Sequence, residues 1–350
     1  METKQIGKIR YFVGIDVSKL TFNYCLRYGG NNVLNGKAGN NVESIKEFIA
    51  TLKEIPEFKL GQAIFGLEVT GVYGLTLMNT LSKMRAKVVV EPAIKIKNSL
   101  GIVRGKNDKL DAARITRYLI KNLQELKLWT PRRLIIDELD SLSTMRDRIV
   151  KVNSMLNVPL DEDEGFINKQ ISDNNRKLCA PTISNCQQLM LDIDARIFTT
   201  WKNDERCNRL MQIMLSVKGI GSVTALAILI QTNEFKSITT ARQFASYCGV
   251  APFEYNSGTS VKRISRVSSM ANKYVKSLLH NCVRSCIGFD PEIKAYYKRR
   301  VEVDKKNKMT VMNAIKFKLL CRVFACVRTD RMYEEGYVSK GLGEVEAQLV

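Results

Sequence analysis

Two kinds of hydrophobic pattern divide the chain. The first part carries short, mostly apolar runs rich in β-branched and aromatic residues, separated by Gly and Asn, and then alternates such runs with helical periodicity. Strands are expected at residues 10–18, 21–27, 32–37, 63–67 and 86–91, and helices at residues 42–53, after Tyr73, and onward to about residue 122. Strands followed by strand–helix alternation predict a mixed α/β sheet.

From residue 131 the apolar positions recur at alternating steps of four and three residues, which is a heptad pattern. The positions are Ile135, Leu139, Leu142, Met145, Ile149, Val152 and Leu156, and after an acidic loop at 161–164 they resume at Ile183, Cys186, Met190, Ile193 and Ile197. A helical hairpin or coiled coil is expected here, serving either as a spacer or as an oligomerisation element. From about Cys207, glycines and a proline punctuate a compact, mostly helical domain.

These changes of pattern set the expected domain boundaries. The chain divides into an α/β domain at residues 1–130, a helical coiled-coil linker or oligomerisation region at 131–206, a mostly α domain at 207–335, and a tail at 336–350.

The charge distribution indicates which class of molecule the protein binds. Lys and Arg number 55 against 35 Asp and Glu, and the net charge of +20 is spread as +10, −1 and +11 over residues 1–130, 131–210 and 211–350. Two basic blocks around a neutral middle suit a polyanion, either nucleic acid or an anionic membrane face. Nine cysteines without a CxxC pair indicate reduced intracellular thiols, and no apolar run is long enough to span a membrane. We therefore expect a cytoplasmic, nucleoid-associated protein with no membrane partner.

Acidic residues at the ends of two predicted strands are the first candidate chemistry. Asp16 lies near the end of the first strand, and Glu68 ends the apolar run AIFGLE before a Gly-containing turn. Asp108 and Asp111 are three residues apart, so on a helix they share a face. The alternative role is a strand-terminal cap for Asp16 and helix N-terminal capping for Asp108. Together, four hard oxygen ligands predict a cage for one or two Mg²⁺ ions, which act in phosphoryl transfer.

The second candidate is a serine. Ser257 lies in an Asn-Ser-Gly loop, with Lys262, Arg263 and Arg266 following within nine residues. Such a serine is suited to attack a phosphodiester whose charge the cations hold. Turn formation is the alternative role for Ser257, and Ser260 and Ser265 compete with it as the nucleophile.

A Gly-Ile-Gly turn is the third candidate. Gly219 and Gly221 precede a small and apolar helical run, as in a helix-hairpin-helix, where backbone N–H groups at a helix start hold a phosphate and Lys218 adds charge. A plain packing corner is the alternative. The single histidine, His280, stands near Cys282 and Cys286, and core packing explains these three residues better than a zinc site.

Taken together, the segments GIDVSK, LEVTGVYG, KNDKLDAARI, the GIG turn and YCGVAP with NSGTS resemble the DEDD transposases of the insertion-sequence class related to the Piv invertases. The resemblance covers roughly residues 10–125 and 207–285. It implies a RuvC-like N-terminal domain of RNase H fold and a C-terminal serine transposase domain.

The resemblance also implies roles and partners. Asp16, Glu68, Asp108 and Asp111 match the acidic metal-site residues, with Mg²⁺ as cofactor and Mn²⁺ as a substitute, and Ser257 matches the nucleophile that joins covalently to a DNA end. Nucleic-acid contacts are expected from Lys218, Gly219, Gly221, Lys262, Arg263, Arg266 and Lys273. The implied partners are donor and target DNA, a noncoding bridge RNA, and further copies of the chain in a dimer or tetramer with composite active sites.

Three other functions stay open from the sequence. A Piv-like invertase acts on fixed sites with the same chemistry, whereas a metal-only RuvC-like junction nuclease forms no covalent adduct. A non-catalytic nucleic-acid-binding protein keeps the fold without the activity.

Overall fold

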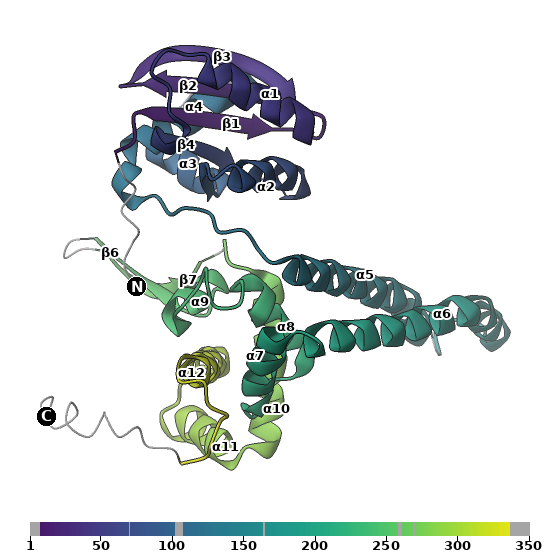
Figure 1. Ribbon diagram of the computed structural model, residues 1–350. Helices are drawn as coiled ribbons and strands as arrows, with labels where there is room; N and C mark the ends of the chain where they lie inside the picture. The colour runs from purple at the N-terminus through teal and green to yellow at the C-terminus, as the bar shows by residue number, and fades with distance from the viewer. Residues whose placement is uncertain are drawn as a thin grey trace, which may run out of the picture. The chain divides into compact units, whose positions relative to one another are not determined.

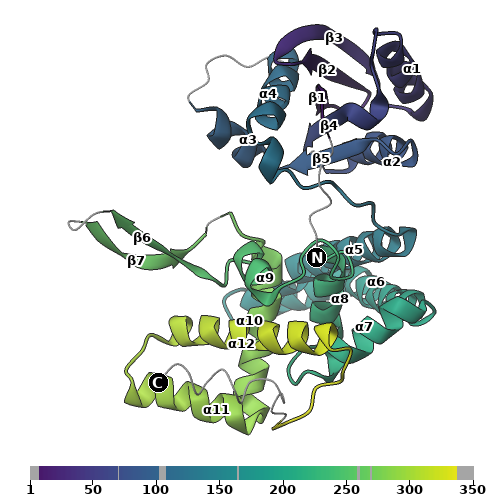
Figure 2. The ribbon, with the colours of Figure 1, turned by 60° about the vertical axis from the view of Figure 1, so that its left-hand side comes forward.

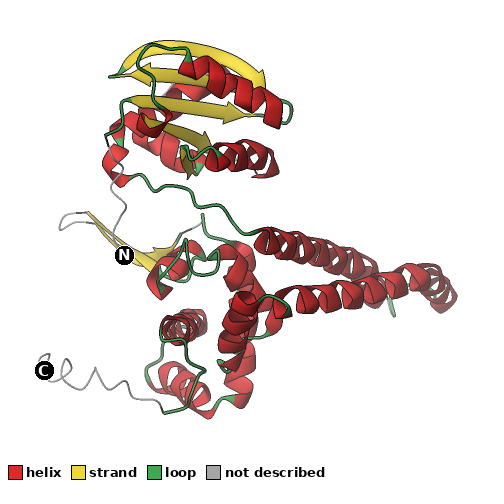
Figure 3. Ribbon diagram, viewed as in Figure 1, coloured by secondary structure: helices red, strands yellow, loops and turns green. Residues whose placement is uncertain are grey.

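The computed structural model describes residues 8–69, 71–101, 108–163, 165–257, 261–268 and 270–336, and the chain divides into two compact units, residues 1–131 and 132–350. Strands gather in the first unit, whereas the second is built from helices and a single hairpin of strands (Figure 3). The expected fold class, α/β at the N-terminus followed by a mostly helical remainder, is confirmed at this level. No helix in these ranges is both long and apolar enough to cross a membrane.

Five strands form a mixed sheet in the first unit, in the order β3-β2-β1-β4-β5 (Figure 2). They are β1 (Tyr11–Val17), β2 (Thr21–Tyr28), β3 (Asn31–Gly39), β4 (Ala63–Glu68) and β5 (Lys87–Glu91). The first three strands pair antiparallel as a meander, and β4 and β5 run parallel to β1. Gly29 and Gly30 connect β2 to β3 with positive φ angles, which suits a tight hairpin turn. The β1–β2 connection holds neither Gly nor Asn, and the Ser18 N–H closes it by donating to the carbonyl oxygen of Thr21 at 2.9 Å.

Helices cover both faces of this sheet (Figure 2). The helical segments are α1 (Val42–Lys53), α2 (Leu75–Lys83), α3 (Ala93–Leu100), α4 (Asp108–Lys121) and the short turns η1 (Leu60–Gln62), η2 (Gly71–Gly74) and η3 (Leu123–Glu125). The helices α1 and α2 bury their apolar sides against Val13, Ile15 and Phe65. The helices α3 and α4 pack on the other face, against Phe12 and Ile64. Alternate strand residues therefore enter two separate cores, as the pleat requires.

The second unit begins with a helical hairpin made of α5 (Leu134–Glu162) and α6 (Lys169–Lys202), which pack side by side (Figure 1). The heptad positions Leu139, Ile193 and Ile197 are buried where the two helices meet the rest of the unit. Arg146 of α5 makes a bidentate ion pair with Asp194 of α6, at 2.6 and 3.1 Å. The helical hairpin expected from the heptad pattern is therefore present.

Two details of the hairpin differ from the expectation. The expected acidic loop at 161–164 begins inside α5, which continues to Glu162, and α6 starts well before the resumed seam. Two seam positions, Met145 and Val152, are exposed at 47% and 42% rather than packed against α6. Other positions far from the base are buried, among them Cys186 of the seam and Leu160, so the seam is closed at some heptad positions and open at others.

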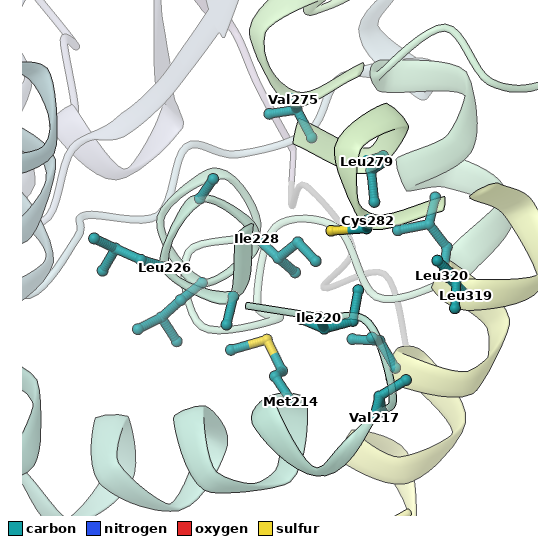
Figure 4. Close-up of a cluster of buried hydrophobic side chains, with 14 of the residues drawn as sticks. Met214, Val217, Ile220, Leu226, Ile228, Val275, Leu279, Cys282, Leu319 and Leu320 are labelled. Atoms are coloured by element: carbon teal, nitrogen blue, oxygen red, sulfur yellow. The ribbon is translucent and has the colours of Figure 1, made fainter. Parts of the chain in front are cut away.

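Beyond the hairpin, helices surround one nearly all-apolar helix, α8. The remaining elements are α7 (Glu205–Ser216), α8 (Ser222–Gln231), α9 (Ala241–Tyr247), β6 (Pro252–Ser257), β7 (Val261–Val267), α10 (Lys273–Phe289), α11 (Pro291–Lys298), η4 (Arg299–Val303) and α12 (Lys308–Arg328). Every residue of α8 from Thr224 to Ile230 is buried. Figure 4 shows Leu226 and Ile228 of this helix among side chains from α7, α10 and α12.

An ionic cluster around the buried carboxylate of Glu234 ties the base of the hairpin to this core. Arg133, directly before α5, makes a bidentate pair with Asp204 at 2.7 and 2.8 Å and also donates to Glu234 at 2.6 Å. The Glu234 side chain is fully buried and also pairs with Arg206 and Lys236. Hydrogen bonds from Arg133 hold the pKa of Asp204 well below its usual range. Burial alone would raise the pKa of Glu234, but the hydrogen bonds from Arg133 and Lys236 outweigh it and lower that pKa.

Candidate metal centre and nucleic-acid interface

The predicted acids at the strand ends lie side by side in the sheet. The register of the parallel pair β1–β4 ends at Ile15 opposite Leu67, and Asp16 and Glu68 are the next residues of the two strands. Both side chains are half-buried. Adjacent strands in a sheet are about 4.8 Å apart, so two acids in this register are close neighbours. The sequence placed each acid at a strand end, and the structure adds that the two strands are neighbours.

Two glycines show which face of the sheet these acids occupy. A Cβ on Gly14 would lie 2.3 Å from the carbonyl oxygen of Ala112, and a Cβ on Gly66 would lie 2.7 Å from Leu119. Both contacts are with α4. Because side chains alternate between faces, Asp16 and Glu68, each two residues further along its strand, project on the same face as α4. This is the helix on which Asp108 and Asp111 lie.

Helix α4 is held closely against β1 and β2. The hydroxyl of Thr116 accepts a hydrogen bond from the Gly14 N–H at 3.0 Å and lies 2.9 Å from the carbonyl oxygens of both Cys25 and Ala112. One turn earlier, Asp111 is half-buried and pairs with Arg114 at 2.5 Å. This guanidinium balances the charge of Asp111. Asp108 is the first residue of α4, and its side chain lies outside the described part of the structure.

A third strand-end acid, Glu91, was missed by the sequence analysis. It is the last residue of β5, it stands opposite Glu68 in the register of β4 and β5, and only 8% of it is exposed. The hydroxyl of Tyr118 and the ammonium group of Lys95 donate to its Oε1 at 3.0 and 2.8 Å. Burial raises the pKa of Tyr118, which keeps this hydroxyl a donor. The run KVVVE has the same apolar-then-acid form as AIFGLE, and that signal was available in the sequence.

The donor set suits a hard divalent cation, because carboxylate oxygens are the ligands that Mg²⁺ prefers. Asp16 and Glu68 lie on the face of the sheet that α4 covers, and Asp111 is half-buried in the first turn of that helix. Among the side chains that the structure describes, no group of three or more His, Cys, Asp or Glu is close enough to hold a metal ion. That description excludes the side chain of Asp108.

The candidate nucleophile lies in a different unit, at the end of a strand. Ser257 is the last residue of β6, and the backbone pairs it with Val261, the first residue of β7. The same register places Lys262 opposite Asn256, Arg263 opposite Tyr255 and Arg266 opposite Phe253. The three cations and the serine therefore share one β-hairpin, which the sequence analysis treated as a loop. The side chains of these four residues, and residues 258–260, lie outside the part of the chain that the structure describes.

The Gly-Ile-Gly turn joins α7 to α8, as expected for two helices linked by a tight corner. Gly219 has φ +86°, and a Cβ there would lie 2.0 Å from the sulfur of Cys286 in α10. Both reasons require glycine at this position. Gly221 is the N-cap residue of α8 and has an extended backbone, so the first N–H groups of α8 follow it directly.

An acidic segment near the end of the described chain lies on this turn. Lys218 pairs with Glu335, and the N–H of Tyr333 donates to the hydroxyl of Ser216 at 2.7 Å. Arg209 of α7 holds Asp330 at 2.9 Å. Lys218, a predicted phosphate contact, therefore already has a carboxylate partner within the chain.

The remaining predicted positions fall on α10. Lys273 is exposed at its first turn, while Cys282 and Cys286 are buried in the core of the second unit, as the core-packing interpretation predicts. His280 and Arg284 line a pocket of about 370 Å³ together with Tyr297 and Met312. All nine cysteines are free thiols.

Comparison with known proteins places this arrangement in a class. Residues 13–157 match a family of DEDD transposases, and residues 211–298 match the family described as "Transposase IS116/IS110/IS902 family". The two matches cover both the acidic strand ends with α4 and the segment that holds the Gly-Ile-Gly turn and the serine hairpin. The class is that of DNA transposases.

Similar proteins narrow the class to a family. The pilin gene-inverting protein of Moraxella bovis is 25% identical over 332 residues, covering 93% of this chain and 98% of that protein. An uncharacterised protein of the insertion element IS110 from Streptomyces coelicolor is 27% identical over 125 residues, 36% of this chain and 30% of that protein. A probable family 20 transposase of Pseudomonas aeruginosa is 25% identical over 161 residues, 44% of each chain. The chain belongs to the IS110 family of DEDD transposases, and the resemblance found in the sequence is confirmed.

Proposed function

We propose that this transposase cuts and rejoins DNA through Ser257, assisted by divalent metal bound at Asp16, Glu68, Asp108 and Asp111. The observation that carries the proposal is the register of β1 and β4, which sets Asp16 beside Glu68 on the face that α4 covers. A mixed sheet with this strand order and with acids at neighbouring strand ends supports an RNase H-like, RuvC-like identity for the first unit.

In the proposed site the protein supplies ligands from two kinds of element. Asp16 and Glu68 approach from the strand ends, and Asp108 and Asp111 from the first turn of α4. Bound Mg²⁺, or Mn²⁺ in its place, would supply Lewis acidity toward phosphodiester oxygens. Arg114 neutralises Asp111 through an ion pair, and Asp111 would have to leave this pair, at least in part, to hold a metal ion.

The proposed covalent step uses the serine hydroxyl. The Oγ of Ser257 attacks the phosphorus of a DNA phosphodiester, a serine–phosphate bond forms, and the bond to the leaving deoxyribose oxygen breaks, with that oxygen taking up a proton. In the rejoining step, a hydroxyl at another DNA end attacks the phosphorus of the phosphoserine and releases the serine hydroxyl. Strands are thereby exchanged with no net loss of phosphodiester bonds.

The serine hairpin β6–β7 and the Gly-Ile-Gly turn offer cations and backbone N–H groups that are suited to bind the DNA phosphate backbone. The proposed contacts are Lys262, Arg263 and Arg266 beside the nucleophile and Lys218, Gly219, Gly221 and Lys273 further away. Their support is the hairpin register and the helix start after Gly221, where backbone N–H groups favour an anion.

The proposal also includes an RNA partner and assembly of several copies of the chain. The +10 and +11 blocks offer enough basic surface for a noncoding bridge RNA as well as donor and target DNA. The helical hairpin exposes several large apolar side chains, among them Met155 at 75%, Leu178 at 78% and Leu191 at 64%. Exposed apolar side chains on a long hairpin favour its packing against another copy in a dimer or tetramer. Serine and acids lie in separate units, which suits composite active sites.

DNA inversion is the second candidate function, and one observation favours it. The pilin gene-inverting proteins match nearly the whole chain, whereas the transposase relatives match less than half of it. A plasmid assay with matched insertion and inversion reporters separates the two functions. Inversion between fixed sites without RNA would favour the invertase.

The metal site is tested by Asp16→Asn and Asp111→Asn, with Glu47→Gln on the exposed side of α1 as control. Both site variants are expected to lose DNA strand cleavage by at least about 100-fold while binding DNA as wild type does, because removing one charge-stabilising group typically costs that much. The control should retain both activities. Full cleavage by either site variant would contradict the assignment.

A further inference from the structure

Glu91 stands out because it is a buried acid with no role in the proposed chemistry. It lies beside Glu68 in the sheet and on the same face, with 8% exposure. A buried carboxylate is costly unless it is paired and hydrogen-bonded. Its position is therefore maintained by its partners.

Those partners come from two helices and meet at one oxygen. Lys95 is four residues further along the chain, in α3, and Tyr118 is on α4. Tyr118 is only 1% exposed. Its hydroxyl is a buried polar group, and Glu91 is the acceptor that satisfies it. Lys95 balances the charge of Glu91 and so reduces its repulsion of Glu68.

The bond from Tyr118 fixes the helix that carries two of the proposed ligands. Tyr118 is seven residues after Asp111, two helical turns, so both lie on one face of α4. Thr116 attaches α4 to β1 through the Gly14 N–H, and Tyr118 attaches it to β5. In the sheet β4 lies between those strands. Attachment on both sides of β4 fixes the rotation of α4 about its axis as well as its height above the sheet.

We infer that Glu91 is a positioning residue for the divalent-metal site: through Tyr118 it sets the rotation of α4 and so aims Asp111 toward Asp16 and Glu68. This inference rests on the proposed metal-dependent function. The Oε1 of Glu91 accepts from both Tyr118 and Lys95, which is why the inference assigns Glu91 a positioning role and not that of a ligand. Partners that orient ligands in this way typically change metal affinity by about 10- to 100-fold.

The first test uses the full chain and Mn²⁺ alone, without DNA. Tyr118→Phe keeps the ring and removes the hydroxyl, and we expect a Mn²⁺ Kd at least about 10-fold weaker by electron paramagnetic resonance titration. Hydrogen exchange of the peptide covering α4 should also become faster. The matched control is Tyr24→Phe, a tyrosine that packs in the core on the opposite face of the sheet. It should leave the Kd and α4 exchange unchanged.

The second test separates position from charge. Glu91→Gln retains an amide oxygen that accepts from Tyr118, so we expect Mn²⁺ affinity near that of wild type, whereas Glu91→Ala should resemble Tyr118→Phe. If the Gln variant loses as much affinity as the Ala variant, the charge acts directly and the inference is overturned. Unchanged Kd and α4 exchange in Tyr118→Phe would also overturn it.

The same titration distinguishes failure of this inference from failure of the proposed function. Mn²⁺ binding by the wild type that Asp16→Asn does not weaken would overturn the metal site and the role of Glu91 together. Binding that depends on Asp16 but not on Tyr118 would overturn the role of Glu91 alone.

Discussion

Replacing Gly14 with alanine tests the close packing that positions the acidic site. A Cβ at this position would lie 2.3 Å from the carbonyl oxygen of Ala112 and 2.4 Å from the backbone nitrogen of Thr116. Contacting heavy atoms prefer about 3.5 Å, so α4 must move by roughly 1 Å. These are backbone atoms of a packed helix, which cannot rotate away as a flexible side chain would. The movement also strains the bond between the Gly14 N–H and Thr116.

The expected cost follows from two opposing effects. Overpacking of this kind costs about 1–3 kcal/mol, and a backbone clash falls at the upper end. Alanine has less conformational freedom than glycine in the unfolded chain, and this difference stabilises the folded state by about 0.4–1 kcal/mol. The net loss of about 2 kcal/mol raises the unfolded fraction of the first unit by roughly 30-fold.

Hydrogen exchange on the full chain measures this effect unit by unit. Peptides from β1 and α4 should exchange faster in Gly14→Ala, and peptides from α8 should not change. The control is Gly61→Ala, because a Cβ there meets nothing within 4 Å. The control should be neutral or slightly stabilising. Equal exchange in the Gly14 and Gly61 variants would refute the claim that α4 packs directly on the Gly14 backbone.

Three further predictions concern the second unit. Arg133→Met should lower its free energy of unfolding by about 2 kcal/mol in urea, because the buried Glu234 loses one of its cations. The folded-state pKa values of Asp204 and Glu234 are lowered, so the stability that these two carboxylates contribute is complete above about pH 4.5 and is lost as the pH falls toward the folded-state values. Unfolding temperatures measured from pH 6 to pH 2 should show this loss of stability. The loss should be smaller in Arg133→Met. Glu335→Gln should release Lys218 and raise DNA affinity about twofold in filter binding.

Each of these predictions has a matched control. Arg148→Met changes an exposed cation of α5 and should leave the unfolding free energy within about 0.5 kcal/mol of wild type. Equal destabilisation in both arginine variants, or an identical acid profile in Arg133→Met and wild type, would contradict the stabilising role of the ionic cluster around Glu234. Glu334→Gln is the neighbour control for Glu335→Gln. If neither variant alters DNA affinity, Lys218 does not contact the phosphate backbone of DNA.

The acidic strand ends could be predicted because their local pattern is strong. An apolar run closed by an acid indicates a strand end, and this placed Asp16 and Glu68 correctly on β1 and β4. The sequence could not show that β1 and β4 are neighbours in parallel register, since strand pairing depends on contacts distant along the chain. Glu91 has the same local signal, but its importance depends on Tyr118, which is 27 residues away.

The heptad pattern was informative about the hairpin and less so about its surface. It predicted two helices with a shared seam, which α5 and α6 form. It could not distinguish seam positions buried within one chain, such as Leu139, from those that stay exposed, such as Met145. Periodicity gives the face of a helix and not its partner. In the same way, the turn signal around Ser257 indicated a loop, because the strand pairing of β6 with β7 is not encoded in the turn residues themselves.

The most direct test of the proposed chemistry is a denaturing gel that detects protein covalently joined to DNA. Wild type, Ser257→Ala and Ser265→Ala are each incubated with bridge RNA, donor and target DNA and Mg²⁺. The account predicts an adduct in the wild type and in Ser265→Ala, and none in Ser257→Ala. An adduct that persists in Ser257→Ala, or cleaved DNA with no adduct in any protein, would contradict it.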